Sequence, residues 1–430
     1  PIKFGMKTET LPKPEDAKEE DAAPTKEVDN IINNPSPAWT KQPSELKDED
    51  YSGFYRELYP MQFEEPLFNI HLNVDYPFNL TGILYFPKMN KDMQIQKDKI
   101  QLYQNQVFVT DNVEGIVPEF LTMLRGVIDS PDIPLNVSRS YLQADGAVKK
   151  ISSYITRKVG DKLKSLFNDN REEFNAKWDD IKIVIEYGML TEDKFFDKAQ
   201  DFMLYPTVDG NYHTFAELKE KLAAAQTDKD DKLVLLYASN KEEQHSYIAA
   251  AKDKGYEVLL LDSPIISHLI QKMETSQEKI SFARVDGDHI DNLIKKDEEA
   301  ISKLSDQEKE TLKTFLTQTI PAEKFSVQLE AMDSKSNPFI ITEPEFMRRM
   351  KEMQQNGGGG GMFGMGNMPD MYNLIVNTNH ELVTEILNTK TAKKKERLVN
   401  QALDLAKLSK GILKGEDMTA FINRSYEMIK

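Results

Sequence analysis

The chain has 430 residues, of which 39% are hydrophobic and 29% charged, so it is long enough for two to four domains and too apolar to be disordered throughout. Its net charge of −16 argues against broad nucleic-acid binding and disfavours anionic membranes. It has no cysteine, which excludes disulfides, thiol catalysis and zinc ribbons, and it has no apolar run long enough to cross a bilayer.

The N-terminal third is predicted to pass from a linker into a mixed α/β unit. Residues 10–33 are rich in Lys, Glu, Asp and Pro and cannot bury a core, so we interpret them as a flexible charged linker. Order is expected from about Pro35. The periodicity then predicts a helix, a half-buried strand, a second strand, and either two further strands or one interrupted by a bulge, at residues 51–58, 68–74, 82–87 and 102–109.

The middle of the chain is predicted to be helical up to residue 222, with Thr214 capping the last of these helices. Residues 232–288 then form a compact βαβ unit, because a continuous apolar run at 233–237 indicates a buried strand before a helix. A nucleotide-binding role would need glycines after that first strand, and the turn Ala238-Ser239-Asn240-Lys241 has none. We therefore interpret the unit as a structural layer.

A methionine-rich helix is predicted after Thr342, which with Glu345 forms a capping box around Pro344. Its apolar side chains are Phe346, Met347, Met350 and Met353. Flexible thioethers usually fill gaps in a core, but they also suit an adaptable surface for unfolded chains. The loop that follows is rich in Met and Gly, which favours exposure of this helix.

Two apolar stripes near the C-terminus have helical spacing. The first contains Leu398, Ala402, Leu405 and Leu408, and the second contains Phe421, Ile422, Tyr426 and Ile429. Packing within one chain is the simpler interpretation. The number of stripes in roughly 100 residues favours a partner chain instead.

Two other patterns argue against bound ligands. The run Gly357 to Gly361 lacks the Gly-Lys-Ser/Thr of a phosphate loop and is interpreted as a flexible loop. No two of the six histidines share metal-ligand spacing on one element, so we expect no metal site.

The segment Ile133 to Gln143 is the most informative part of the chain. Its prolines and an Asn/Ser pair form a turn that can open a helix, with Arg139 in the first turn. A cation at a helix start opposes the macrodipole unless an anion docks there, and Gln143 lies four residues on, on the same face. An arginine paired with a nearby carboxylate on the surface is the alternative.

The sequence from Arg125 to Gln143 resembles the middle domain of the ninety-kilodalton heat-shock chaperone family, and is most similar to its bacterial form. The family pattern is RGV-D-S, two or three residues, then LPLN-[IV]-SRE-x-LQ. Here Ile133 replaces the first Leu and Ser140 replaces the Glu, whereas Asn136, Arg139 and Gln143 match. Pro37-Ala38-Trp39-Thr40 resembles the family's entry to this domain.

The resemblance runs along the whole chain and implies its fold and organisation. The fold class is α/β (α+β overall), with two α/β middle subdomains joined by helices and an α+β C-terminal dimerisation domain. The implied parts are the end of an N-terminal ATP-binding domain that is otherwise missing, a linker, a large middle subdomain, a helical connector, a small middle subdomain and the dimerisation domain, at residues 1–9, 10–33, 34–165, 166–225, 226–299 and 300–430.

The same resemblance implies an ATP-dependent, cytoplasmic heat-shock chaperone that binds partly folded client proteins. ATP and Mg²⁺ belong to the missing domain in cis, so the fragment alone should be inactive. Arg139 would contact the γ-phosphate, and Asn136 and Gln143 would hold the catalytic loop. The clients would bind Trp39 and the methionine-rich helix, and the two C-terminal stripes would form a homodimer.

A dimeric scaffold with no catalytic contribution is the alternative, in which Arg139 only pairs with a carboxylate. The two functions differ in suppression of thermal aggregation of a test protein, which only a client-binding surface should provide. Neither function involves nucleic acid or membranes.

Overall fold

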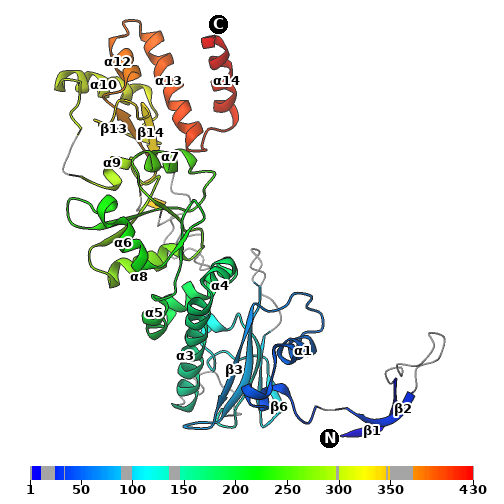
Figure 1. The fold of residues 1–430 in the computed structure, drawn as a ribbon. Helices are drawn as coiled ribbons and strands as arrows, with labels where there is room; N and C mark the ends of the chain where they lie inside the picture. Colours follow the sequence, from blue (N-terminus) through cyan, green and yellow to red (C-terminus); the bar gives the residue numbers. More distant parts are fainter. Residues whose placement is uncertain are drawn as a thin grey trace, which may run out of the picture. The chain divides into compact units, whose positions relative to one another are not determined.

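The structure is a computed structural model and describes residues 2–10, 25–32, 34–88, 99–134, 146–296, 300–344, 347–348 and 371–429 (Figure 1). Contacts divide the chain into two compact units, Pro1–Val184 and Ile185–Lys430. Sheets and helices alternate in both, which confirms the predicted fold class. Among the helices that the structure describes, none has the length and apolarity to cross a membrane.

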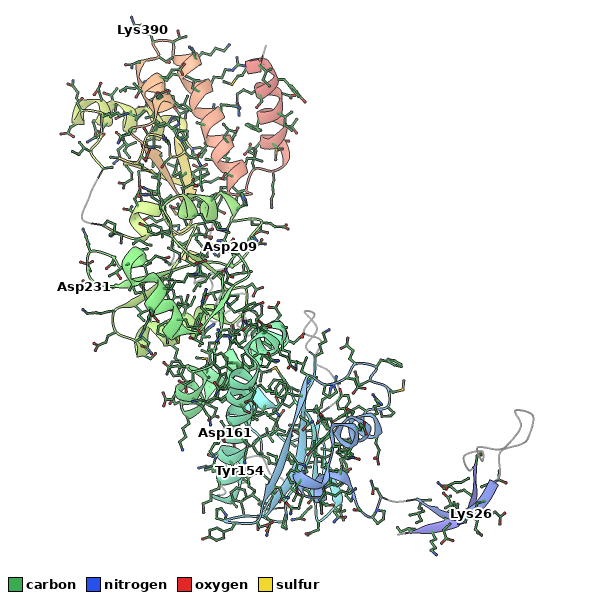
Figure 2. All side chains as sticks on the ribbon, in the orientation of Figure 1. Lys26, Tyr154, Asp161, Asp209, Asp231 and Lys390 are labelled. Carbon is green, nitrogen blue, oxygen red and sulfur yellow. The ribbon has the colours of Figure 1, made fainter. Side chains whose placement is uncertain are left out.

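The predicted linker contains a strand. β1 (Lys3–Thr10) pairs antiparallel with β2 (Thr25–Ile31), so that Lys7 faces Val28 and Thr8 faces Glu27. Every residue of β1 is exposed, and the side chain of Lys26 stands out into solvent (Figure 2). The pair of strands therefore has no buried core of its own, as the composition predicts, but backbone pairing needs none. Residues 11–24 lie outside the described part.

A five-stranded sheet forms the centre of the first unit, in the order β3-β4-β7-β5-β6. Its strands are Phe68–Val74, Leu80–Phe86, Ile100–Gln104, Val107–Thr110 and Arg125–Asp129 for β3, β4, β5, β6 and β7. β5 pairs parallel with β7, and the other pairs are antiparallel. The sequence left open whether residues 102–109 form two strands or one interrupted strand, and the structure shows two strands, β5 and β6. They are joined by Asn105 and Gln106, both at positive φ, and their register is irregular at Leu102 and Tyr103.

Helices cover both faces of this sheet. Figure 1 shows α1 (Asp48–Leu58) and α3 (Gly146–Asp169) on opposite sides of it. On the α1 side, three aromatic residues of that helix pack with Ile83, Tyr85 and Val127 of the sheet and with the short helix η1 (Ala38–Thr40). On the other side α3 buries an apolar stripe that includes Val148, Ile151 and Ile155 and packs against β3. Two further 3-10 turns are η2 (Pro43–Glu45) and η3 (Glu119–Leu121).

The predicted helical stretch is confirmed. α4 (Arg171–Thr191), α5 (Asp193–Ala199) and α6 (Phe215–Gln226) follow α3, with the short strands β8 (Tyr205–Pro206) and β9 (Tyr212–His213) between α5 and α6. Thr214 caps α6 as predicted, because its Oγ1 accepts a hydrogen bond from the Glu217 N–H at 3.3 Å while the Glu217 carboxylate accepts the Thr214 N–H at 2.7 Å.

The second unit contains the predicted βαβ layer. All six residues of β10 (Leu233–Ala238) are buried, and β10 pairs parallel with β11 (Val258–Leu260) through α7 (His245–Asp253). A third parallel strand, β12 (Ile280–Arg284), follows α8 (Ile266–Ser276) and was not predicted. α9 (Ile290–Leu293) comes directly after it.

The last part combines a three-stranded sheet with helices. β13 (Phe325–Glu330), β15 (Tyr372–Asn377) and β14 (Phe339–Thr342) lie in that order, with α10 (Asp306–Thr319), α12 (Glu381–Asn388) and α13 (Ala392–Ser409) around their core. α14 (Gly415–Ile429) runs beside α13 (Figure 1). Thr342 is the last residue of β14, and Glu345 lies outside the described residues, so the capping box stays a prediction.

Gly126 tests the packing of the central sheet. Its φ is +128°, and a Cβ there would overlap the carbonyl oxygen of Ile83 on β4. Gly126→Ala should therefore lower the free energy of unfolding by about 2–5 kcal/mol, combining backbone strain with overpacking, as measured by urea unfolding. Gly53→Ala in α1 is the matched control, because nothing lies within 4 Å of a Cβ there and it should raise stability by about 0.5–1 kcal/mol. Equal effects of the two changes would contradict this account.

Candidate functional site

The predicted nucleotide-contacting residues Asn136, Arg139 and Gln143 lie in 135–145, outside the described residues. The structure describes both flanks of that segment: β7 with residues 130–134 before it, and α3, which starts at Gly146, after it. How firmly these flanks are held therefore bears on what the segment can do.

Asp129, the last residue of β7, is buried and orients two neighbouring segments. Its Oδ2 accepts a hydrogen bond from the indole Nε1–H of Trp39 at 3.1 Å and another from the backbone N–H of Gln106 at 2.9 Å. A carboxylate that accepts two N–H bonds is well compensated for its burial. The Asp of the family motif therefore has a structural role at the end of β7, because its hydrogen bonds hold Trp39 and Gln106 in place.

Hydrogen bonds also hold the residues that follow β7. The hydroxyl of Ser130 donates to the carbonyl of Asn79 at 2.6 Å, and the carboxylate of Asp132 accepts the Asn79 N–H at 2.7 Å. From the other side, Nε2 of Gln104 donates to the carbonyls of Pro131 and Ile133 at 3.1 and 3.2 Å. The chain therefore enters the 135–145 segment from a fixed base, which we call the β7 exit (residues 129–134).

Arg125 and Gly126 hold the beginning of β7. The guanidinium of Arg125 is buried, donates to the hydroxyl of Tyr55 and lies 5.7 Å from the ring centroid of Tyr59. The Gly126 N–H donates to the Tyr59 hydroxyl at 2.7 Å. The arginine of the RGV motif therefore belongs to the core.

Trp39 is not on an apolar surface, which corrects the prediction. It is 6% exposed, and its ring packs against Phe54 and Tyr103 at centroid distances of 5.4 and 4.9 Å. The bond from its indole to Asp129 explains the burial, because it satisfies the only polar atom of the ring. A client contact through Trp39 would require the ring to leave this position.

Of the methionine-rich helix, only Met347 and Arg348 are described; Phe346, Met350 and Met353 lie outside the described residues. Met347 is half-buried. Arg348 is buried, its N–H donates to the Pro344 carbonyl at 3.1 Å, and its Nη2 donates to the hydroxyl of Tyr237 on β10 at 2.9 Å. The first turn after β14 is therefore attached to the parallel sheet.

A buried charge cluster, which no pattern in the sequence predicted, lies beside this turn. Asp286, whose side chain is 4% exposed, pairs with Lys410 at the end of α13 and with Nε of Arg284 at 2.5 Å. Arg284 also pairs with Glu343 at 3.1 Å, and Gln244 donates to Asp286 at 2.8 Å. We call Arg284, Asp286, Glu343 and Lys410 the junction cluster, because it joins the β12 turn, the end of β14 and the end of α13.

The electrostatics of the junction cluster favour its ionised state. Burial alone would raise the pKa of the Asp286 carboxyl, but Arg284 and Lys410 outweigh that effect and hold the pKa below its ordinary value. Two cations meet two carboxylates, so the cluster as a whole is balanced. Lys410 comes 124 residues after Asp286, which is why no local pattern in the sequence could reveal it.

The predicted dimer stripes divide into inward and outward parts. Leu398 and Ala402 pack into the core of their own chain, and Phe421 is half-buried. The other five are exposed: Leu405, Leu408, Ile422, Tyr426 and Ile429. Gly415–Ile429, all of them described, include no buried residue.

Polar contacts hold α14 to α13. Arg424 donates to Gln401 at 2.8 Å and pairs with Asp404, and Arg397 pairs with Glu427 at 3.1 Å. Most apolar side chains of α14 are exposed, and only Met418 and Phe421 are half-buried among the apolar residues of this helix. This arrangement leaves an apolar face open along the two helices.

Within the ranges that the structure describes, no three His, Asp or Glu side chains gather closely enough to hold a metal ion. The prediction that the chain has no metal site stays a prediction for the chain as a whole.

Comparison with known proteins identifies the family. A family model described as Hsp90 protein matches residues 5–430. Chaperone protein htpG of Bacteroides fragilis strain 638R is 45% identical over 100% of this chain and 71% of its own length. Chaperone protein HtpG of Porphyromonas gingivalis strain ATCC 33277 is 51% identical over 90% of this chain and 56% of its own length, and that of Myxococcus xanthus is 28% identical over 80% and 52%.

The chain belongs to the Hsp90 family of chaperones. Within it, the chain is of the bacterial HtpG type, which confirms the resemblance seen between Arg125 and Gln143. It spans 71% of the length of the first relative and little more than half of the other two.

Asp286→Asn tests the junction cluster. The change leaves the buried ammonium of Lys410 without its carboxylate, so we expect the free energy of unfolding at neutral pH to fall by about 3–5 kcal/mol. Asp209→Asn is the control: it breaks a largely exposed pair with Lys252 at 2.5 Å (Asp209 is labelled in Figure 2) and should cost about 0–1 kcal/mol. Urea unfolding measures both.

We also expect the stability difference between the parent and Asp286→Asn to depend on pH. Because the folded-state pKa of Asp286 is depressed, its contribution is present above the unfolded-state pKa of about 3.9 and is lost as the pH falls through the folded-state value. The stability difference between parent and Asp286→Asn should be constant near neutrality and shrink below about pH 4. A difference that stays the same at every pH would refute the assignment.

Proposed function

We propose that the chain is the middle and C-terminal part of an ATP-dependent cytoplasmic chaperone that binds partly folded proteins. Membership of the Hsp90 family over residues 5–430 is the observation that carries this proposal. Following the resemblance, we assign ATP and Mg²⁺ to an N-terminal ATP-binding region in cis. The work of this chain is then to supply a residue to that region, to bind clients and to dimerise.

In this proposal Arg139 contacts the γ-phosphate, and Asn136 and Gln143 support the segment that carries it. The β7 exit gives physical support, because Asp129, Ser130 and Asp132 fasten the chain immediately before residue 135. A contact residue on a fixed base loses less conformational entropy when it meets its ligand. In the proposed role, the guanidinium of Arg139 stabilises the charge that develops on the transferring phosphoryl group.

Clients, we propose, bind to the helix that carries Phe346, Met347, Met350 and Met353. The attachment of Arg348 to Tyr237 supports this, since it fixes the start of the helix against the parallel sheet and leaves Met347 half-buried beside it. Unbranched methionine side chains adapt to many apolar partners. The buried Trp39 is left out of this proposed surface.

Dimerisation, we propose, uses the open apolar face of α13 and α14. Tyr426 and Ile429 are 67% and 83% exposed, and Leu405, Leu408 and Ile422 lie exposed on the same pair of helices. Apolar side chains in that number along two adjacent helices favour burial against a second copy. The dimer would raise the effective concentration of the two N-terminal regions for each other.

Arg139→Ala tests the phosphate contact. In a protein in which this chain follows the N-terminal region of the Bacteroides fragilis relative, the change should lower ATP turnover by roughly 10³–10⁵ without loss of ATP binding. Arg157→Ala, an exposed arginine of α3, should leave turnover unchanged. Turnover is measured as phosphate release at saturating ATP. If Arg139→Ala hydrolysed ATP at the parental rate, the proposed role would fail and the scaffold alternative would gain.

Leu408→Glu and Ile422→Glu test the dimer. A carboxylate in an apolar interface is costly to desolvate, so each variant should have the mass of one chain where the parent has the mass of two. Light scattering after size exclusion measures this. Ile301→Glu is the control, since Ile301 is 88% exposed outside both helices and its change should leave a dimer. A parent that is monomeric, or variants that stay dimeric, would exclude this interface.

A further inference from the structure

Gln104 is the last residue of β5, and its side chain reaches the β7 exit. β5 runs parallel to β7, and the backbone contact between them continues one residue past β7, because the Ser130 N–H donates to the Tyr103 carbonyl at 3.2 Å. From there the amide of Gln104 takes over. Its Nε2 donates to the carbonyls of Pro131 and Ile133 at 3.1 and 3.2 Å. We call these two hydrogen bonds the glutamine clamp.

A glutamine stands here where the strand pattern calls for an apolar residue. Side chains alternate along a strand, so Gln104 shares a face of the sheet with Ile100 and Leu102, which are both buried. Gln104 itself is half-buried. A polar side chain that loses water needs a partner, and so do backbone carbonyls. The clamp satisfies both needs, and because carbonyl oxygens can only accept, the amide nitrogen must face them.

The glutamine clamp fixes the direction in which the chain leaves the β7 exit. Ile133 is 3% exposed, so its side chain anchors the turn in the apolar core while Gln104 holds its carbonyl. That carbonyl belongs to the planar peptide group that joins Ile133 to Pro134, and the proline ring holds the next backbone angle, φ, at about −65°. Between the clamp and residue 135 the backbone therefore keeps a single soft torsion, ψ of Pro134.

The other contacts of the β7 exit act earlier along the chain. Asn79 holds Ser130 and Asp132 through its backbone carbonyl and N–H. Of the side-chain hydrogen bonds that the structure describes at residues 129–134, the one from Gln104 to the Ile133 carbonyl lies nearest in sequence to Arg139. Loss of the clamp should therefore change the direction of the chain beyond Pro134 and leave the rest of the β7 exit in place.

We propose that Gln104 is a positioning residue for the phosphate contact of Arg139. It acts through the backbone of the β7 exit, which carries the chain towards the arginine. Displacing a group by about 1 Å from the atoms on which it acts can cost on the order of 10²-fold in rate, so the direction of this backbone matters for turnover. The inference rests on the proposed function, because Gln104 has this role only if Arg139 contacts the γ-phosphate.

Gln104→Glu tests the clamp at constant side-chain size, because it replaces the N–H donor by a carboxylate oxygen that repels both carbonyls. The test uses the protein in which this chain follows the N-terminal region of the Bacteroides fragilis relative. Turnover at saturating ATP should fall by about five- to thirty-fold, which is the worth of one to two hydrogen bonds. The KM for ATP should stay the same, because the proposed function assigns nucleotide binding to the N-terminal region. Release of radiolabelled phosphate over a range of ATP concentrations measures both.

Gln101→Glu is the matched control on the same strand. It introduces the same charge, but Gln101 uses its side-chain oxygen, which accepts a hydrogen bond from the Tyr103 hydroxyl at 3.2 Å, and a carboxylate keeps that role. Its turnover should equal that of the parent, and a loss as large as in Gln104→Glu would overturn the proposal.

Two further variants separate the donor from charge and from folding. Gln104→Leu, which removes the donor without adding a charge, should also lower turnover, and Gln104→Lys, which restores N–H donors, should recover most of it. Urea unfolding verifies that the variants fold. If Gln104→Glu does not fold, the comparison of Gln104→Leu with Gln104→Lys decides in its place, and equal turnover of these two would overturn the proposal.

A double-mutant cycle with Arg139→Ala separates positioning from general damage. Once the arginine is gone, adding Gln104→Glu should lower turnover by less than about two-fold, because the residue that it positions is missing. A second loss as large as in the parent would indicate a merely structural role and overturn the proposal. Parental turnover in Gln104→Glu, with Arg139→Ala slow, would overturn this inference alone. Parental turnover in Arg139→Ala would overturn the proposed function and this inference with it.

Discussion

The carboxylate of Asp286 governs the second unit, because three segments far apart in the sequence end on it or next to it. β12 ends in Arg284, Lys410 directly follows α13, and Glu343, which directly follows β14, pairs with the same arginine. Burying such charges costs several kcal/mol for each ion, and only close pairing and extra hydrogen bonds offset that cost. Gln244 donates one of those hydrogen bonds to Asp286. Its side-chain oxygen also accepts hydrogen bonds from the backbone N–H groups of Ser239 and Asn240, and so closes the turn after β10, which contains no glycine. Another register of α13 would leave these buried charges unpaired, which disfavours that register.

The first unit uses a carboxylate differently. Asp129 meets no cation in the hydrogen bonds that hold it; it accepts N–H groups from Trp39 and Gln106. This arrangement orients the β7 exit through neutral N–H donors, one of which lies 90 residues away along the chain. Four residues of the family motif RGV-D-S therefore have a structural role in this unit. Arg125 fills the core beside two tyrosines, Gly126 allows β4 to approach, and Asp129 and Ser130 fix the chain before the arginine segment.

Much of the fold could be predicted because it depends on local patterns. The apolar run of β10, the cap at Thr214 and the helical periodicity of α3 and α4 each require only neighbouring residues, and all are confirmed. The features that were not predicted depend on contacts between residues far apart in the sequence. The burial of Trp39 follows from an aspartate 90 residues away, and the junction cluster follows from a lysine 124 residues away.

The stripe on α13 shows why an apolar pattern alone could not separate core from interface. Val399, Ala402, Leu403 and Ala406 are buried in their own chain, while Leu405 and Leu408 face outward. Apolar residues thus occur on two sides of one helix, and periodicity adds them into a single broad stripe. The helix has a mechanical consequence as well: 18 residues of α-helix form a rigid rod, with the outward leucines three turns or fewer from Lys410. Any partner that packed on Leu405 and Leu408 would therefore also restrain Lys410, and through Asp286 the β12 turn and the residue before the methionine-rich helix. One helix and one buried carboxylate therefore connect the outward face of α13 with the end of β14.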